Sequence, residues 1–191
     1  MSNFEFVFSL FGLLLGLALA EVLGGLSDAL QERRKLKVGW LTPLLGLLLV
    51  LDISSFWTVA WSIRDAFRPD YFHLLCGVLI TGTYYFAACL VFPKDPAEWP
   101  DFDVYYFRHK RVVLGGVTFC NVLAYAAQQA LGGEPLAAPL DKLVAALFFP
   151  GLLAAIWAPG RRLNVALLAF LVVQYPVFAS LYMLGYGPGS F

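Results

Sequence analysis

Some acidic side chains in this chain lie inside long apolar segments, where an ionisable group has to be paired, hydrated or functional. Asp52 is the clearest case, because it lies near the middle of the apolar segment 40–63. A charged side chain at the centre of a membrane helix costs roughly 2.5–3.5 kcal/mol on insertion scales. Ser55 follows Asp52 on the same helical face. Asp52 is therefore either a protonatable or cation-coordinating carboxylate in a transport pathway, or a neutral acid that hydrogen-bonds across helices for packing.

Two more acids lie in or just after the first apolar segment. Glu21 and Asp28 are seven residues apart, so they occupy nearly the same face of a helix. One hypothesis is that both attract cations to the inner mouth of a pathway. The other is that Glu21 pairs with a basic residue near that surface, such as Arg33 or Arg34.

The fourth apolar segment carries a polar stripe, in which Thr118, Asn121, Tyr125 and Gln128 recur at helical spacing. Such a stripe faces inward in a helical bundle. It either lines a hydrated path opposite Asp52 or hydrogen-bonds neighbouring helices, which is worth about 0.6–2 kcal/mol per contact in membranes.

The elements that must position these side chains are membrane-spanning helices. Hydrophobic residues make up 60% of the chain and charged residues 14%, whereas soluble domains are about 45–50% apolar and about 25% charged. The apolar runs are continuous and do not alternate with period two, which favours helices over strands in lipid. We predict an all-α polytopic membrane protein, residues 1–191 forming one integral membrane domain, with six spans at about 4–26, 40–63, 71–92, 112–131, 143–158 and 165–186.

The distribution of positive charge predicts the orientation of these spans. The first, third and fifth connections hold ten Lys and Arg residues and the rest of the chain holds three. Cytoplasmic loops retain an excess of Lys and Arg, so we expect both termini on the non-cytoplasmic side. The ten residues are Arg33, Arg34, Lys35, Lys37, Lys94, Arg108, Lys110, Arg111, Arg161 and Arg162.

Three local predictions concern prolines and aromatic residues. The fifth span is short and carries Pro150, which predicts a kinked, tilted or partly re-entrant segment. The third connection, 93–111, is expected to be a solvated linker whose aromatic residues anchor at the lipid headgroups, and the alternative is a regulatory or partner-docking segment. Gln174 is expected to satisfy a backbone carbonyl that Pro176 leaves free. The aromatic anchors of the connection are Tyr105, Tyr106 and Phe107.

A ladder of small residues marks one face of the first span. Gly12, Gly16, Ala20 and Gly24 recur every four residues, and such a face lets helix backbones approach closely in lipid. We interpret it either as a seam between subunits or as a packing surface within one subunit.

Several classes of function find no support in the sequence. A net charge of 0 does not favour nucleic-acid binding, and the three cysteines lie in apolar runs without disulfide or zinc spacing. With two histidines and two methionines, the chain does not offer the axial ligands of a membrane haem protein. We find no nucleophile with a basic partner and no phosphate-binding glycine loop. We therefore expect a protein that is not an enzyme, has no metal or cofactor, and binds lipid.

Two functional hypotheses remain. The first is a small helical channel or transporter, homo-oligomeric, with Asp52 in the pathway. The second is a non-catalytic accessory or scaffold subunit of a larger membrane complex that binds lipid or hydrophobic cofactors. The expected partners are the lipid bilayer and further membrane subunits, and the expected location is a bacterial inner membrane.

Overall fold

The computed structural model describes residues 3–32, 38–64, 70–99, 101–131, 136 and 138–186. Within them the chain forms six long helices, each apolar enough to cross a membrane. The predicted all-α fold with six spans is therefore confirmed. The helices are α1 (Asn3–Glu32), α2 (Leu41–Ser62), α3 (Tyr71–Cys89), α4 (Phe102–Ala130), α5 (Pro139–Trp157) and α6 (Arg161–Leu181), with a short 3₁₀ turn η1 (Pro96–Glu98) and a π-helical turn η2 (Tyr182–Tyr186).

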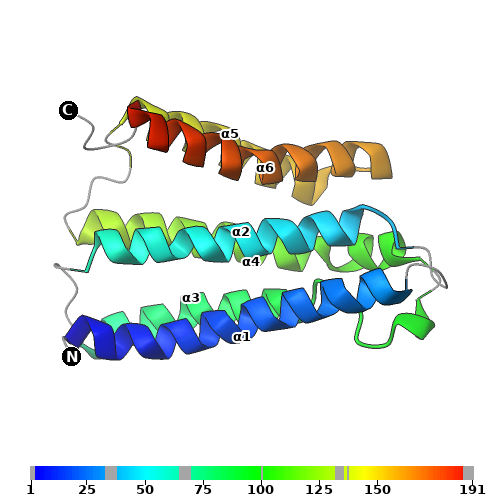
Figure 1. Ribbon diagram of the computed structural model, residues 1–191, viewed down its shortest axis with the longest axis horizontal. Helices are drawn as coiled ribbons and strands as arrows, with labels where there is room; N and C mark the ends of the chain where they lie inside the picture. The colour runs from blue at the N-terminus through cyan, green and yellow to red at the C-terminus, as the bar shows by residue number, and fades with distance from the viewer. Residues whose placement is uncertain are drawn as a thin grey trace.

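The six helices pack as three layers of two (Figure 1). The pair α2 and α4 forms the middle layer, with α1 and α3 on one side and α5 and α6 on the other. Between layers, α2 contacts α1 and α6, while α4 contacts α3 and α5. Helices α2 and α4 are thus the only described helices that touch both outer layers, so side chains on them can connect the whole bundle.

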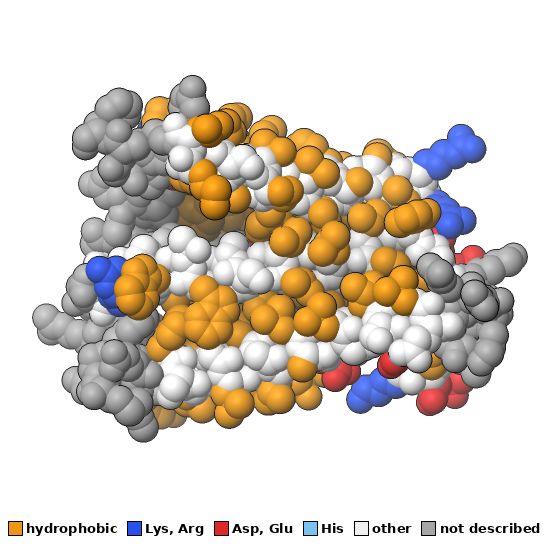
Figure 2. Space-filling view, in the orientation of Figure 1, with side chains coloured by type: hydrophobic (Ala, Val, Ile, Leu, Met, Phe, Trp, Pro, Cys, Tyr) orange, Lys and Arg blue, Asp and Glu red, His pale blue; other side chains and the backbone are white. Residues whose placement is uncertain are grey.

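The two ends of the bundle are distinguished by the helix ends that they carry. We call the end where α1 finishes and α6 begins the basic end, because Arg161 and Arg162 lie there at the start of α6. Figure 2 shows Lys or Arg side chains together with acidic side chains at this end. The other, where α1 begins and α6 finishes, is the terminal end. Trp40 and Trp157, both about 70% exposed, lie at the basic end, and Trp61 lies exposed at the terminal end. This arrangement matches aromatic belts at two lipid interfaces.

Helix α4 begins ten residues earlier than the sequence predicted, at Phe102 instead of 112. The carboxylate of Asp101 caps the helix by accepting a hydrogen bond from the backbone N–H of Asp103 at 2.8 Å. The polar stretch that follows is amphipathic, so its apolar face packs into the bundle. Tyr105 and Tyr106 are buried, and the prediction that they anchor at lipid headgroups is wrong.

Helix α5 is also longer than predicted and continuous. It runs from Pro139 to Trp157 with Pro150 inside it, so the segment crosses as one helix and is not re-entrant. Pro139 lies in the first turn, where the missing backbone N–H costs nothing because that position has no partner within the helix.

Candidate functional site

Asp52 lies at the centre of the bundle and is 1% exposed. Its carboxylate accepts hydrogen bonds from three different helices. The hydroxyl of Tyr84 on α3 donates to Oδ2 at 2.8 Å, and the hydroxyl of Tyr175 on α6 donates to Oδ1 at 2.8 Å. The amide nitrogen of Asn121 on α4 lies 3.0 and 3.1 Å from the two oxygens. This cluster, which we call the Asp52 cluster, joins all three layers of helices.

The orientation of the Asn121 amide follows from its second contact. Its Nδ2 also donates to the backbone carbonyl of Val117 at 3.0 Å. A carbonyl oxygen can only accept a hydrogen bond, so the nitrogen of the amide must face both Val117 and Asp52. The carboxylate therefore meets only donors. Three donors therefore serve the two oxygens of Asp52: the hydroxyls of Tyr84 and Tyr175, and the N–H of Asn121 that does not go to Val117.

The sequence predicted part of this cluster. It placed Asp52 opposite the stripe that carries Asn121, and the structure brings these two side chains together. It missed Tyr84 and Tyr175. Both are tyrosines inside apolar spans, and a buried tyrosine hydroxyl usually has a hydrogen-bond partner, which is the signal that was available in the sequence.

Three other residues of the predicted pathway, Ser55, Tyr125 and Gln128, lie between this cluster and the terminal end. Ser55 donates to the backbone carbonyl of Asp52 at 2.8 Å. Gln128 donates to the hydroxyl of Ser62 at 3.0 Å. Tyr125 packs edge-on against Phe149, with ring centroids 5.6 Å apart. The polar stripe of α4 thus makes contacts with α2 and α5.

Glu21 and Asp28 do not join the Asp52 cluster. Both side chains are exposed on α1, in an outer layer of the bundle. Arg33 and Arg34, the predicted partners of Glu21, lie outside the described residues, as do Lys35 and Lys37 of the predicted basic connections.

The small residues of α1 face two different environments. A Cβ added to Gly12 would lie 2.9 Å from the ring of Trp57, so this glycine allows α2 to approach within the subunit. Gly16, Ala20 and Gly24 are exposed, and a Cβ at either glycine would meet no atom within 4 Å. Packing within the subunit therefore accounts for Gly12 but not for the other three.

A second polar cluster closes the basic end, and it contains a buried lysine. Lys110 on α4 is 4% exposed. Its ammonium donates to the backbone carbonyls of Ala155 and Ala158 at 3.0 and 2.7 Å, and to Oδ1 of Asn164 at 2.9 Å. Tyr106 donates to the same Oδ1 at 2.9 Å. The sequence counted Lys110 among the charges of a connection, whereas the structure places it inside the bundle.

The reason for burying this lysine lies at the end of α5. The carbonyl of Ala155 would ordinarily accept from the N–H four residues later, but that residue is Pro159, which has none. The last carbonyls of a helix need partners from elsewhere and attract positive charge. Lys110 supplies hydrogen-bond donors and a positive charge to these carbonyls. Nδ2 of Asn164 adds hydrogen bonds to the carbonyls of Ala158 and Gly160 at 2.9 and 2.7 Å.

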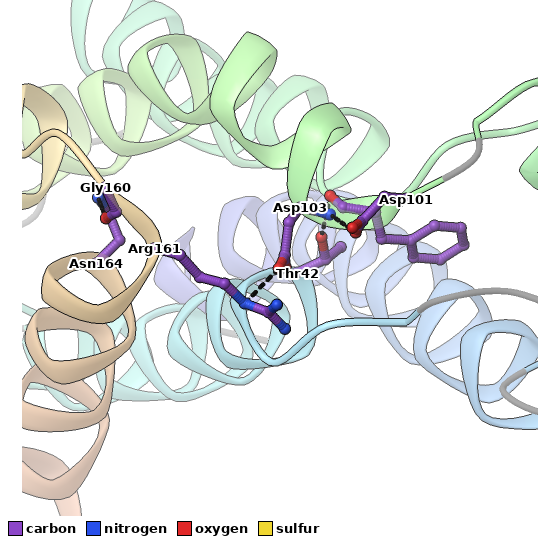
Figure 3. Close-up of polar contacts among 7 residues, drawn as sticks. Thr42, Asp101, Asp103, Gly160, Arg161 and Asn164 are labelled. Carbon is purple, nitrogen blue, oxygen red and sulfur yellow. Dashed lines mark hydrogen bonds and ion pairs between the residues drawn. The ribbon is translucent and has the colours of Figure 1, made fainter.

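Beside this cluster, an ion pair and a hydrogen bond tie α4 to its neighbours (Figure 3). Nε of Arg161, at the start of α6, lies 2.6 Å from Oδ2 of Asp103. On the other side, the hydroxyl of Thr42 on α2 donates to the backbone carbonyl of Phe102 at 3.1 Å. The start of α4 is thus held to both α2 and α6.

The sequence predicted that Gln174 hydrogen-bonds a backbone carbonyl that Pro176 leaves free, and this prediction is wrong. Gln174 is 7% exposed, and neither its Oε1 nor its Nε2 has a hydrogen-bond partner among the described residues. The hydroxyl of Ser180 donates to the carbonyl of Pro176 at 2.7 Å, but this is a separate contact, because the carbonyl that Pro176 leaves free is that of Val172, four residues earlier.

Within the described part of the chain, no group of three His, Cys, Asp or Glu side chains is placed to hold a metal ion. Cys76, Cys89 and Cys120 are free thiols. The groups that could bind or transfer a proton are the Asp52 carboxylate and the hydroxyls around it. No family model, curated protein or solved structure matches the chain.

Proposed function

We propose that the protein is a small, homo-oligomeric membrane transporter in which Asp52 binds and releases a proton. The observation that carries this proposal is a buried carboxylate at the bundle centre, hydrogen-bonded to three helices. Ionisable groups inside membrane spans commonly mark ion and proton pathways. Because Asp52 is 1% exposed, we favour a transporter that changes conformation over a permanently open channel.

The donors around Asp52 favour a proton over a metal cation. Ions such as Ca²⁺ bind to oxygen atoms that offer lone pairs. The carboxylate oxygens of Asp52 are already covered by two hydroxyls and one amide nitrogen, all of which donate hydrogen. A metal ion would have to displace these donors. A proton needs only one oxygen and a small rearrangement.

Protonation of Asp52 would change the contact between layers. A protonated Asp52 donates from one oxygen, so one neighbour must become an acceptor. The nitrogen of Asn121 cannot accept, whereas either tyrosine hydroxyl can. The hydroxyl of Tyr175 on α6 can accept a hydrogen bond from the protonated acid, which reverses the direction of its contact with Asp52. The proton thus alters the hydrogen bond between α2 and α6, which gives a two-state element that ligand binding can bias.

Polar groups at the terminal end support access from that side. Gln128 contacts Ser62 there, and the hydroxyl of Tyr182 donates to the carboxylate of Asp141. Figure 2 shows a hollow at this end between the α5–α6 layer and the α2–α4 layer. The Lys110 cluster binds the same two layers together at the basic end. We infer that the described conformation is closed at the basic end.

The exposed small-residue face of α1 supports the oligomer. Gly16, Ala20 and Gly24 offer a flat surface that the subunit itself does not use, and such surfaces pack helices closely in lipid.

The experiment is a proton-flux assay in liposomes that contain a trapped pH dye, driven by a potassium gradient with valinomycin. The wild-type chain should acidify the lumen faster than empty liposomes, and Asp52→Asn, which keeps the size of the side chain, should abolish the difference. Asp95→Asn, an exposed acid at the basic end, is the matched control. Equal flux in Asp52→Asn and wild type refutes the assignment of Asp52.

An accessory subunit is the second candidate. Its specific support is that both oxygens of Asp52 accept hydrogen bonds within one chain, which also suits a permanent structural contact between helices. Purification in several mild detergents separates the candidates. Consistent recovery with other membrane proteins, together with no flux from the wild-type chain, favours the accessory role, whereas a pure homo-oligomer argues against it.

A further inference from the structure

A cavity of about 210 Å³ opens at the basic end, between the last turns of α1 and the segment that joins α3 to α4. Sites for drug-sized ligands occupy roughly 300–1,000 Å³, so this cavity suits a smaller group. It does not include Asp52 and lies in the outer layer opposite α5 and α6. Its role is therefore independent of the proposed transport pathway.

The cavity is lined by charges of both signs. Asp28 comes from α1 and Lys94 from the segment after α3, and both side chains are exposed. Among the described residues they form no ion pair with each other. The side chain of Gln31, one turn after Asp28, adds a neutral amide to the lining. A ligand that complements this lining carries an anion and a cation a few bonds apart.

Aromatic side chains form the inner wall of the cavity. Phe92 and Phe102 are 8% and 1% exposed. Phe92 lies directly against the backbone of α1, because a Cβ added to Gly25 would come within 2.5 Å of its ring. The charged groups therefore lie on the exposed side of a cavity whose inner side is apolar and closely packed.

The depth of the cavity in the bundle indicates which ligand reaches it. Asp28 lies in the part of α1 that approaches its end at Glu32, and Lys94 follows the end of α3 at Cys89. Helix ends of a spanning bundle lie at the level of the lipid headgroups. A zwitterionic headgroup is present there at high local concentration, whereas a soluble zwitterion must arrive from the aqueous phase.

We propose that this cavity binds the headgroup of a phosphatidylethanolamine-type lipid. Lys94 pairs with the phosphate, and Asp28 accepts charge-assisted hydrogen bonds from the ammonium. Phosphatidylcholine carries the same charges, but its trimethylated nitrogen has no N–H to donate. Phosphatidylglycerol has the phosphate without the cation. Binding should therefore depend on both the charge and the N–H groups of ethanolamine.

The test is native mass spectrometry of the full chain, titrated with the three lipids at matched acyl chains. We expect the ethanolamine lipid to bind at least about tenfold more tightly than the other two, since both of them lack the charge-assisted hydrogen bond from an ammonium N–H to Asp28. Asp28→Asn should remove this preference, and Lys94→Gln should weaken all three lipids. The matched controls are Glu98→Gln and Arg162→Gln, both exposed at the basic end and outside the cavity lining.

Equal affinity for the three lipids overturns the proposal, and this comparison needs only the wild-type chain. A preference that persists in Asp28→Asn also overturns it. A competition arm uses phosphoethanolamine without acyl chains. If it binds as tightly as the lipid, the ligand is a soluble zwitterion and the lipid assignment is wrong.

Discussion

Replacing the buried lysine at the basic end tests whether its hydrogen bonds stabilise the bundle. We predict that Lys110→Met destabilises the fold, because methionine keeps the unbranched apolar part of the side chain but lacks the ammonium and donates nothing. Two of the three acceptors retain another partner. The carbonyl of Ala158 keeps Nδ2 of Asn164, and Oδ1 of Asn164 keeps the hydroxyl of Tyr106. The carbonyl of Ala155 loses the donor that stands in for Pro159.

The magnitude follows from these three contacts. An unsatisfied buried carbonyl costs about 1–3 kcal/mol, and a hydrogen bond between membrane helices contributes about 0.6 kcal/mol on average. Methionine also avoids the desolvation of an ammonium, which offsets part of the loss. We therefore expect a decrease of about 2 kcal/mol in the free energy of unfolding.

Steric trapping in bicelles, which monitors reversible unfolding, measures the difference in the free energy of unfolding between Lys110→Met and the wild type. Arg162→Met serves as the control because Arg162 is exposed on the first turn of α6, and its effect should stay within about 0.5 kcal/mol. The reasoning fails if Lys110→Met unfolds as the wild type does, or if the control loses as much stability.

Three further predictions concern other parts of the bundle. Gly77→Ala should destabilise by about 1–3 kcal/mol in the same unfolding assay, because the new Cβ overlaps the buried ring of Phe11. Gly16→Leu should leave the unfolding of the subunit nearly unchanged but shift the oligomer towards monomers in native mass spectra; an unchanged oligomer excludes this face as the seam. A hydrogen bond from the backbone N–H of His73 lowers the pKa of Asp70, and a second, smaller contribution comes from the hydrogen bond with the His73 ring. This contact therefore stabilises the start of α3 above the ordinary aspartate pKa and is lost as the pH falls through the lowered value, which hydrogen exchange across α3 would detect.

The sequence predicted the number of helices because each span is a long apolar run. It did not predict where α4 begins. Phe102 to Arg111 is charged enough to resemble a connection, and only the packing of its apolar face against the bundle makes it helical. The same stretch contains Lys110, whose partners lie 45 or more positions away in sequence. A charge count cannot distinguish such a lysine from one in a loop.

The Asp52 cluster shows the same limit at the bundle centre. Asp52 was predictable because an acid in a span is unusual, and Asn121 because it belongs to a polar stripe. Tyr84 and Tyr175 lie 32 and 123 positions from Asp52, so their contact depends on which helices become neighbours. Hydrophobic periodicity predicts which face of a helix points inward, but it does not predict which of six helices that face meets.

The two polar clusters differ in how easily they can change. The Lys110 cluster holds α4 to the junction of α5 and α6 through backbone carbonyls that are fixed acceptors. The direction of the bond between Tyr175 and Asp52 depends on whether the carboxylate is protonated. In the proposed transporter, the α5–α6 layer would therefore pivot at the basic end and separate from α2 at the terminal end, where Figure 2 shows the hollow. A motion in the opposite sense would first have to break the buried lysine contacts, which is the more costly rearrangement.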